Sequence, residues 1–356
     1  MLGIGVTSSL LLLCFGETIM GNLDSVAGLT VISVWLFAAI LGSVTSVVRH
    51  ADRLAVRLGE PCGTLILTLA VTAIEVISIS TMMLHGTSKP TLVRDTLFAV
   101  VMITLNGMVG LSLLVGGWHH REQHYNLQGA NSYLGVIIPL AVLCLILPSH
   151  TVSTAGPTLS TVQEAFLALM AVGLYITFLA IQTSRHRAYF TMEEEEGQQE
   201  SPQGTPHSFT AHTTLLLSYM LPVVYLAEQL ARPIDHLIEA SHAPVALGGA
   251  IIAALVATPE AISAVRAARA NRLQRSVNIT LGSVLATIGL TVPTMLVIGH
   301  VTGKKLTLGL ENADLVLLPL TLVMCIVTFA SGRTNILQGA VHLLLFLAFL
   351  VLVFQG

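Results

Sequence analysis

Residues 63–83 read GTLILTLAVTAIEVISISTMM, an almost wholly apolar run with a single carboxylate, Glu75, near its middle. Twenty-one residues are enough to cross a bilayer as an α-helix. A charged side chain near the bilayer centre costs at least ~2.5 kcal/mol on insertion scales, so such residues usually mark functional sites. The stretch therefore predicts a membrane-spanning helix with a functional carboxylate.

A second stretch, residues 248–263 (GGAIIAALVATPEAIS), repeats the first at a constant offset of 185. Gly63 then corresponds to Gly248, and Glu75 corresponds to Glu260. Apolar composition alone produces Ile and Val matches, but it does not explain paired glycines and paired glutamates. We therefore expect the protein to be built around Glu75 and Glu260.

The composition indicates a polytopic membrane protein. Hydrophobic residues make up 54% of the 356 residues, charged residues only 10%, and the mean hydropathy is +0.81. Soluble domains carry about 25% charged residues. The fold class that we predict is all-α, with about eleven membrane helices. Their expected bounds are 2–20, 25–48, 62–84, 95–116, 132–149, 163–183, 212–230, 243–265, 276–300, 313–330 and 335–354.

The distribution of Lys and Arg predicts the orientation. With the N-terminus in the cytoplasm, eleven of the sixteen basic residues fall in cytoplasmic segments, as the positive-inside rule requires. The C-terminus is then outside. Five spans separate the two glutamate helices, so these helices cross in opposite directions, as in transporters built from inverted repeats.

This pattern divides the chain into four parts. Residues 1–24 form an extra span, 25–183 the first inverted repeat and 212–356 the second. Residues 184–211 between them are hydrophilic and contain the run Glu193–Glu196, a composition typical of a disordered tether. We place this linker in the cytoplasm, where a weak cation-sensing role is the alternative to a plain tether.

Hydroxyl side chains accompany Glu75 on its helix. Thr68, Thr72 and Ser78 lie seven and three residues before it and three after it, so all three share its helix face. Oxygen ligands on one face suit a hard cation such as Ca²⁺, which binds six to eight oxygens. The alternative for each hydroxyl is a hydrogen bond within its own helix or between helices.

The second carboxylate lies in the segment Ala257-Thr258-Pro259-Glu260. Because proline lacks an N–H and displaces the carbonyl four residues back, the Leu255 carbonyl is a candidate ligand. A plain proline kink is the alternative. Thr258, beside Glu260, together with Asn106 and Ser283 on the two spans that follow the glutamate spans, completes the candidate cation and proton ligands, with Thr287 as a further oxygen. For Asn106, Ser283 and Thr287 the alternative is a packing contact between helices. His342 is interpreted as a hydrogen-bonded core residue.

Five ordered segments resemble the calcium/cation antiporter superfamily, and within it the bacterial ChaA-type sodium/calcium–proton antiporters. They are residues 46–76, 90–117, 243–263, 271–293 and 331–343. The resemblance implies a ten-helix core of two inverted halves, with Glu75 and Glu260 as the two acidic residues of the central cation site. Thr72, Ala257 and Ala286 stand where related calcium exchangers have amide ligands, so the resemblance leaves Na⁺ and K⁺ open beside Ca²⁺.

These observations predict a secondary cation/proton antiporter that exports Ca²⁺ or Na⁺, or K⁺, through a site centred on the two glutamates. An antiporter selective for Na⁺ or K⁺ and a passive cation channel are the alternatives. An intramembrane enzyme is disfavoured, because the chain has no His-Glu-x-x-His motif and no aspartate pair inside its spans.

We expect no cofactor, and no partner other than membrane lipid and the transported cations and protons. Nucleic acid is not an expected ligand, and the oligomeric state stays open. The expected location is the bacterial inner membrane.

Overall fold

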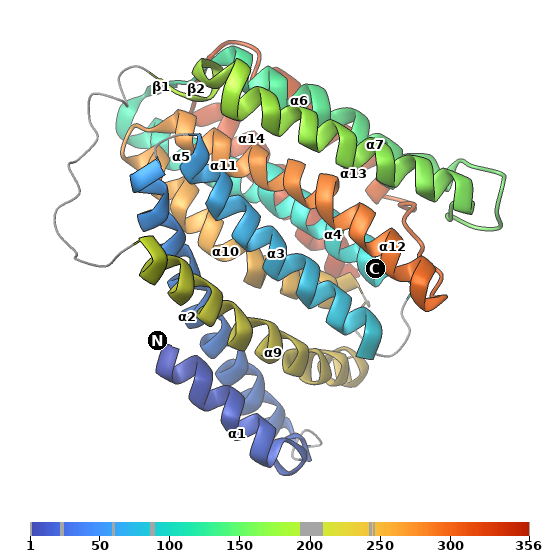
Figure 1. The fold of residues 1–356 in the computed structure, drawn as a ribbon. Helices are drawn as coiled ribbons and strands as arrows, with labels where there is room; N and C mark the ends of the chain where they lie inside the picture. Colours follow the sequence, from blue (N-terminus) through green and yellow to red (C-terminus); the bar gives the residue numbers. More distant parts are fainter. Residues whose placement is uncertain are drawn as a thin grey trace.

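The computed structural model describes residues 2–21, 25–58, 61–85, 90–192, 209–241, 244 and 246–355 (Figure 1). The elements of the first part are α1 (Leu2–Met20), α2 (Val26–Leu58), α3 (Cys62–His85), α4 (Leu92–Met102), η1 (Ile103–Met108), α5 (Val109–His120), β1 (Glu122–His124), α6 (Leu127–Ala141), η2 (Val142–Ile146), η3 (Leu147–Ser149), α7 (Thr161–Ala180), η4 (Ile181–Arg185) and η5 (Arg187–Phe190). The elements of the second part are α9 (Phe209–Ser241), α10 (Ala246–Arg269), α11 (Leu273–Ala286), η6 (Thr287–Thr291), α12 (Val292–Thr302), α13 (Asp314–Thr328), β2 (Arg333–Asn335) and α14 (Ile336–Gln355).

The all-α membrane fold predicted from the sequence is confirmed. Within the described residues, ten helices are long and apolar enough to span a bilayer, several of them built from consecutive α and η elements. The tenth predicted span, 313–330, corresponds to α13, which is shorter at 15 residues. Helix α13 ends at Thr328, and the chain then turns into β2, which forms a small sheet that the sequence pattern did not predict.

One end of the helix bundle gathers four arginine-bearing segments, residues 121–126, 185–190, 266–275 and 331–335. Strands β1 and β2 pair antiparallel there. The Asn126 side chain donates to the Ala188 carbonyl at 3.1 Å, and its backbone N–H donates to Gln274 Oε1 at 2.7 Å. Gln123 donates to the Ala268 carbonyl at 2.7 Å. We call this the arginine-rich end.

The distribution of Lys and Arg assigns other segments to the outside of the membrane. These segments meet at the end of the bundle opposite the arginine-rich end. The Leu310 N–H donates to the Leu145 carbonyl at 2.8 Å, and the Thr307 N–H donates to the Pro90 carbonyl at 3.0 Å. The Arg94 guanidinium contacts Asp95 at 2.9 Å and Glu311 at 3.2 Å. The chain therefore alternates between two ends in the order that the sequence predicted.

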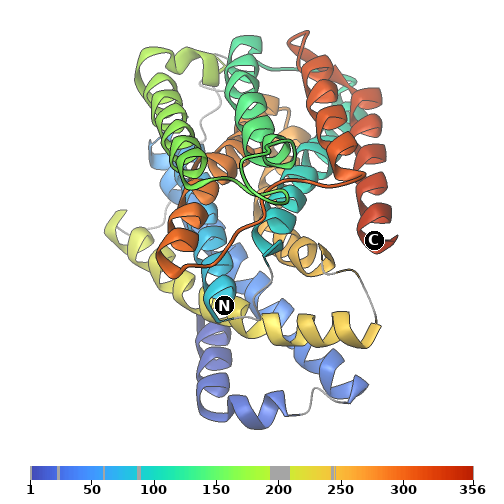
Figure 2. The same ribbon diagram turned by 90° about the vertical axis from the view of Figure 1, so that its right-hand side faces the viewer.

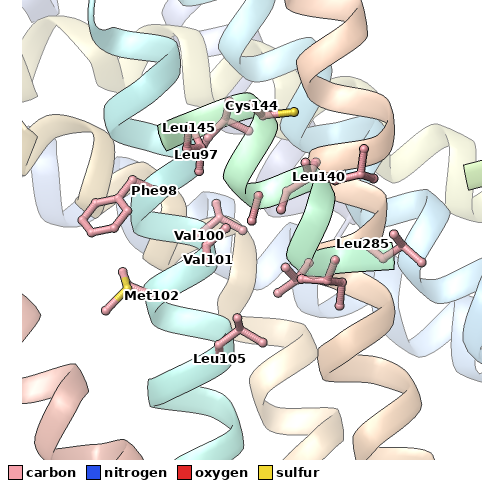
Figure 3. Close-up of a cluster of buried hydrophobic side chains, with 14 of the residues drawn as sticks. Leu97, Phe98, Val100, Val101, Met102, Leu105, Leu140, Cys144, Leu145 and Leu285 are labelled. Carbon is pink, nitrogen blue, oxygen red and sulfur yellow. The ribbon is translucent and has the colours of Figure 1, made fainter. Parts of the chain in front are cut away.

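Two buried hydrophobic clusters fill the interior. The larger one joins α4 to α7 with α11 to α14, and Figure 3 shows its centre, where Leu97, Leu140 and Leu285 come from three different helices. The smaller one joins α1, α2 and α9. These three helices lie together on one side of the molecule in both views (Figures 1 and 2). Helices α3 and α10 contribute side chains to both clusters, so they form the boundary between them.

Two helices extend well beyond their predicted spans. Helices α2 and α9 each contain 33 residues, against expected bounds of 25–48 and 212–230, and they pack against each other. A hydropathy scan does not detect these extensions, because the added helical turns contain polar and charged residues. The division into two repeats stays a prediction, and the acidic run Glu193–Glu196 of the linker lies outside the described residues.

Candidate functional site

Glu75 and Glu260 lie at the boundary between the two hydrophobic clusters, on α3 and α10. Their side chains are 4% and 1% exposed. Hydroxyls four residues apart on one helical segment contact the two carboxylates, so the carboxylates lie close to each other. Two buried acids side by side cannot both stay charged without a compensating positive charge. The fold thus brings together the two residues that the sequence repeat singled out.

One helical segment holds both carboxylates. The Ser283 hydroxyl on α11 donates to Glu260 Oε2 at 2.6 Å, and the Thr287 hydroxyl at the start of η6 donates to Glu75 Oε2 at 2.8 Å. Ser283 and Thr287 are four residues apart, so they share one helix face. Glu75 belongs to the first predicted repeat and Glu260 to the second, so this one segment orients a carboxylate from each repeat.

The remaining oxygens of the site have no hydrogen-bond partner within the described part of the chain. They are Oε1 of Glu75, Oε1 of Glu260 and the hydroxyls of Thr68 and Ser78, all fully buried. Thr72 is also buried, on the same face of α3 as Glu75. Buried oxygens without partners are costly, so this group is suited to an additional positive ligand.

Helix α10 continues through Pro259. Two predicted ligands lie next to this proline, the Leu255 carbonyl and the Thr258 hydroxyl, and only the first of them is free of a hydrogen bond within the helix. The proline has no N–H to offer, so the carbonyl of Leu255 loses its helical donor beside the site. The Thr258 hydroxyl instead donates to the Ala254 carbonyl at 2.6 Å within its own helix. The structure therefore does not direct the hydroxyl of Thr258 toward the carboxylates.

Asn106 belongs to a separate buried network. Its amide nitrogen donates to the Thr321 hydroxyl at 2.8 Å, and its oxygen lies 3.2 Å from His342 Nδ1. The other ring nitrogen of His342 contacts the Thr328 hydroxyl at 2.9 Å. The hydrogen-bonded core role expected for His342 is confirmed, and Asn106 binds that histidine rather than a carboxylate.

The central spans of both parts of the chain contain a π-helical turn. These turns are η1, which contains Asn106, and η6, which begins at Thr287. A π-turn disrupts the regular helical hydrogen bonds and is frequent at functional sites. In η6 the widened turn begins at the residue that binds Glu75. From the sequence Thr287 was expected only as a further oxygen, although its spacing of four residues from Ser283 places the two hydroxyls on one helix face.

The donor set suits a hard cation or protons. Among the described residues, no three His, Cys, Asp or Glu side chains gather into a metal-binding group. Carboxylate, hydroxyl and carbonyl oxygens are the ligands of hard cations. Two carboxylates can also each take a proton, so the same atoms serve either occupant.

The fold and the buried carboxylate pair define a polytopic membrane protein with an oxygen-lined site at the centre of its helix bundle. The family model described as "Sodium/calcium exchanger protein" matches residues 5–184 and 211–355, and the chain belongs to this family.

Two relatives and one solved structure show the extent of the similarity. The chain is 40% identical over 338 residues to the sodium-potassium/proton antiporter ChaA of Escherichia coli, covering 94% of this chain and 92% of that one. It is 42% identical over 312 residues to the putative ionic transporter y4hA of Sinorhizobium fredii, covering 87% and 85%. The Ca²⁺/H⁺ antiporter protein YfkE has the same fold, with a TM-score of 0.73 at 20% identity over 99% and 98% of the two chains.

Proposed function

We propose that the protein is a secondary antiporter that exchanges a metal cation for protons at the site of Glu75 and Glu260. The observation that carries the proposal is that one carboxylate oxygen of each glutamate is held by a hydroxyl of the α11–η6 segment, while the other oxygen is buried without a partner. Membership of the sodium/calcium exchanger family and the antiporter names of its relatives support it.

Coupling follows from charge balance at the buried pair. When both carboxylates are charged, the low-dielectric site needs a cation, because two uncompensated charges cannot be buried together. When protons neutralise them, the cation loses its electrostatic attraction. Cation and protons therefore exclude each other, the pair titrates as one coupled unit, and cation affinity falls as the pH drops. The proton gradient then drives cation export.

The position of the site between two packed clusters supports alternating access. Helices α2 and α9 pack on each other in the smaller cluster, whereas the α11–η6 segment belongs mainly to the larger one. Rigid clusters that meet along α3 and α10 can move as bodies without repacking their interiors. In this proposal α2 and α9 rock against the larger cluster and expose the site to one end of the bundle at a time.

The ligand set favours Na⁺ or K⁺ at least as much as Ca²⁺. Ca²⁺ binds six to eight oxygens. The amide of Asn106 is engaged with Thr321 and His342, and the hydroxyl of Thr258 bonds within its own helix. The close relative in Escherichia coli is named for sodium and potassium. We propose that Na⁺ or K⁺ is exchanged for H⁺, with Ca²⁺ as the competing substrate to be tested.

The test is proton flux in proteoliposomes, driven separately by Na⁺, K⁺ and Ca²⁺. Glu75→Gln and Glu260→Gln keep the side-chain shape and remove the charge, so each should abolish exchange with all three cations. Glu122→Gln is the control, because the Glu122 side chain is exposed at the arginine-rich end, where it pairs with Arg333. Near-normal cation-dependent proton flux in either site variant would contradict the proposal, and voltage-driven current without an opposing gradient would indicate a channel.

A further inference from the structure

Two buried amide side chains, Gln274 and Asn278, lie on α11 between the arginine-rich end and the carboxylate site. They are 1% and 0% exposed and four residues apart, so they share one helix face. Thr287 follows Asn278 by nine residues, which is about two and a half helical turns. The two amides therefore lie on the face of α11 opposite the hydroxyl that binds Glu75.

The two amides belong to a continuous chain of hydrogen bonds, which we call the amide ladder. The Asn126 backbone N–H donates to Gln274 Oε1 at 2.7 Å, and Gln274 Nε2 donates to Asn278 Oδ1 at 2.9 Å. Asn278 Nδ2 in turn donates to the Phe190 carbonyl at 2.8 Å. A backbone N–H only donates and a carbonyl only accepts, so the two ends of the ladder determine which way both amides point.

The ladder is anchored to parts of the fold outside α11. Phe190, the last residue of η5, is fully buried, and its ring packs edge-on against those of Tyr133 and Phe178 at centroid distances of 5.5 Å. On α6, a methyl group added at Gly129 would lie 2.2 Å from the Tyr189 carbonyl oxygen, so glycine is needed for this close approach of the two backbones. The ladder thus connects α11 to a closely packed platform of α6 and η5.

The other face of α11 has little tolerance for movement. Ser283 and Thr287 bind the two carboxylates at 2.6 and 2.8 Å, and hydrogen bonds between hydroxyl and carboxylate oxygens span only about 2.5–3.0 Å. Ser283 lies five residues beyond Asn278, or about 7.5 Å along the helix axis. A small shift or rotation of α11 at the ladder would therefore change both bonds to the carboxylates.

We propose that Asn278 is a positioning residue for cation exchange. Through the amide ladder it holds α11 at the height and rotation at which Ser283 and Thr287 meet the two glutamates. Without this amide, α11 moves and the carboxylates lose hydrogen bonds that stabilise their charged form, so protons compete better with the cation. The inference rests on the proposed function, because it needs the carboxylates to bind the cation.

The experiment measures apparent Na⁺ affinity against pH, together with the maximal rate of Na⁺/H⁺ exchange in proteoliposomes. Asn278→Leu keeps a similar volume and removes the hydrogen bonds of the amide. Affinity near neutral pH should fall roughly threefold to tenfold, with a smaller loss at alkaline pH and an unchanged maximal rate. Gln182→Leu is the matched control and should keep the wild-type affinity, because this buried amide donates to the Tyr133 hydroxyl and not to a member of the ladder.

A double-mutant cycle separates positioning from a general loss of stability. When Ser283→Ala and Thr287→Val are combined, both hydrogen bonds to the carboxylates are already absent. Asn278→Leu added to this background should therefore lower the Na⁺ affinity no further. An equal loss in both backgrounds, or a fall in maximal rate at constant affinity, would overturn the inference.

Phe190→Leu provides a second test, which leaves α11 unchanged and serves also if Asn278→Leu does not fold. It loosens the anchor of the ladder by exchanging one apolar side chain for another, and it should cause a smaller loss of affinity with the same pH dependence. Wild-type affinity at every pH in this variant would contradict the positioning role. If the wild-type protein itself exchanges no cation for protons, the proposed function is wrong; if it does and the losses add, only the role of Asn278 is wrong.

Discussion

At the scale of single residues, the site is defined by four side chains on three helices. Two are the carboxylates of Glu75 and Glu260, and two are the hydroxyls of Ser283 and Thr287 that orient them. A hydroxyl that donates to a carboxylate stabilises the charged form of that carboxylate. In the proposed function the charged form binds the cation, so the two hydroxyls would act through the glutamates and set how strongly the cation competes with protons.

Removing either hydroxyl should weaken cation binding more than maximal transport. Hydrogen bonds to charged groups contribute about 1.5–3 kcal/mol, so Thr287→Val or Ser283→Ala should lower apparent Na⁺ affinity by roughly tenfold or more. The loss should be largest near neutral pH and smaller at alkaline pH, where protons compete less. Apparent affinity against pH in proteoliposomes measures this, with Thr287→Ser as the control that keeps the hydroxyl. A fall in maximal rate at constant affinity would contradict the positioning role.

At the scale of elements, α5 and α14 approach so closely that their backbones touch. A methyl group at Gly339 would lie 2.5 Å from the Leu114 nitrogen and 2.9 Å from the Gly110 carbonyl oxygen. One at Gly110 would lie 2.9 Å from the Leu343 nitrogen. Small residues at helix interfaces in membranes permit this packing, which gains dispersion energy where no hydrophobic effect is available. The contact also positions α14 so that His342 reaches Asn106.

Gly339→Ala should destabilise the protein because backbone atoms cannot move aside as a flexible side chain can. Overpacking of this kind costs ~1–3 kcal/mol. We expect a lower midpoint of thermal unfolding in detergent, measured by the fluorescence of a thiol-reactive or tryptophan probe. Gly135→Ala, whose new methyl group meets no neighbour, should keep the wild-type midpoint. Equal midpoints for the two variants would show that the helices separate at no cost.

At the scale of the whole molecule, the chain alternates between two ends that differ in basic residues. The arginine-rich end carries Arg121, Arg185, Arg187 and Arg333 together with the four arginines of residues 266–275, whereas the described residues at the other end include Arg94, Lys304 and Lys305. The Lys304 ammonium binds the Met83 carbonyl there. The positive-inside rule then predicts that the arginine-rich end faces the cytoplasm.

Cysteine labelling tests this orientation in intact cells. In a variant without the four native cysteines, Val152→Cys should react with a membrane-impermeant maleimide added outside, because this side chain is 99% exposed at the arginine-poor end. Glu122→Cys, exposed on strand β1 at the arginine-rich end, should react only after the membrane is permeabilised. Labelling of both positions from outside, or the reverse pattern, would refute the predicted orientation.

Local chemistry was enough to predict the membrane class, most helices and the two glutamates. A helix that crosses a bilayer must be apolar along its whole length, so hydropathy locates it without knowledge of its neighbours. A carboxylate inside such a run is costly to place in a bilayer, so it indicates a functional residue. The repeat at an offset of 185 residues pairs Glu75 with Glu260 from the sequence alone. The hydroxyls that share a helix with Glu75 followed from helical periodicity.

Only the tertiary structure decided which side chains complete the site. Thr287 binds Glu75 across 212 positions of sequence, and Asn106 binds His342 across 236. Such contacts depend on how helices rotate and pack, which one-dimensional patterns do not encode. The same is true of the small sheet that β1 and β2 form, which joins segments about 210 positions apart. Residue type and spacing indicate which oxygens are available, but packing determines which of them meet.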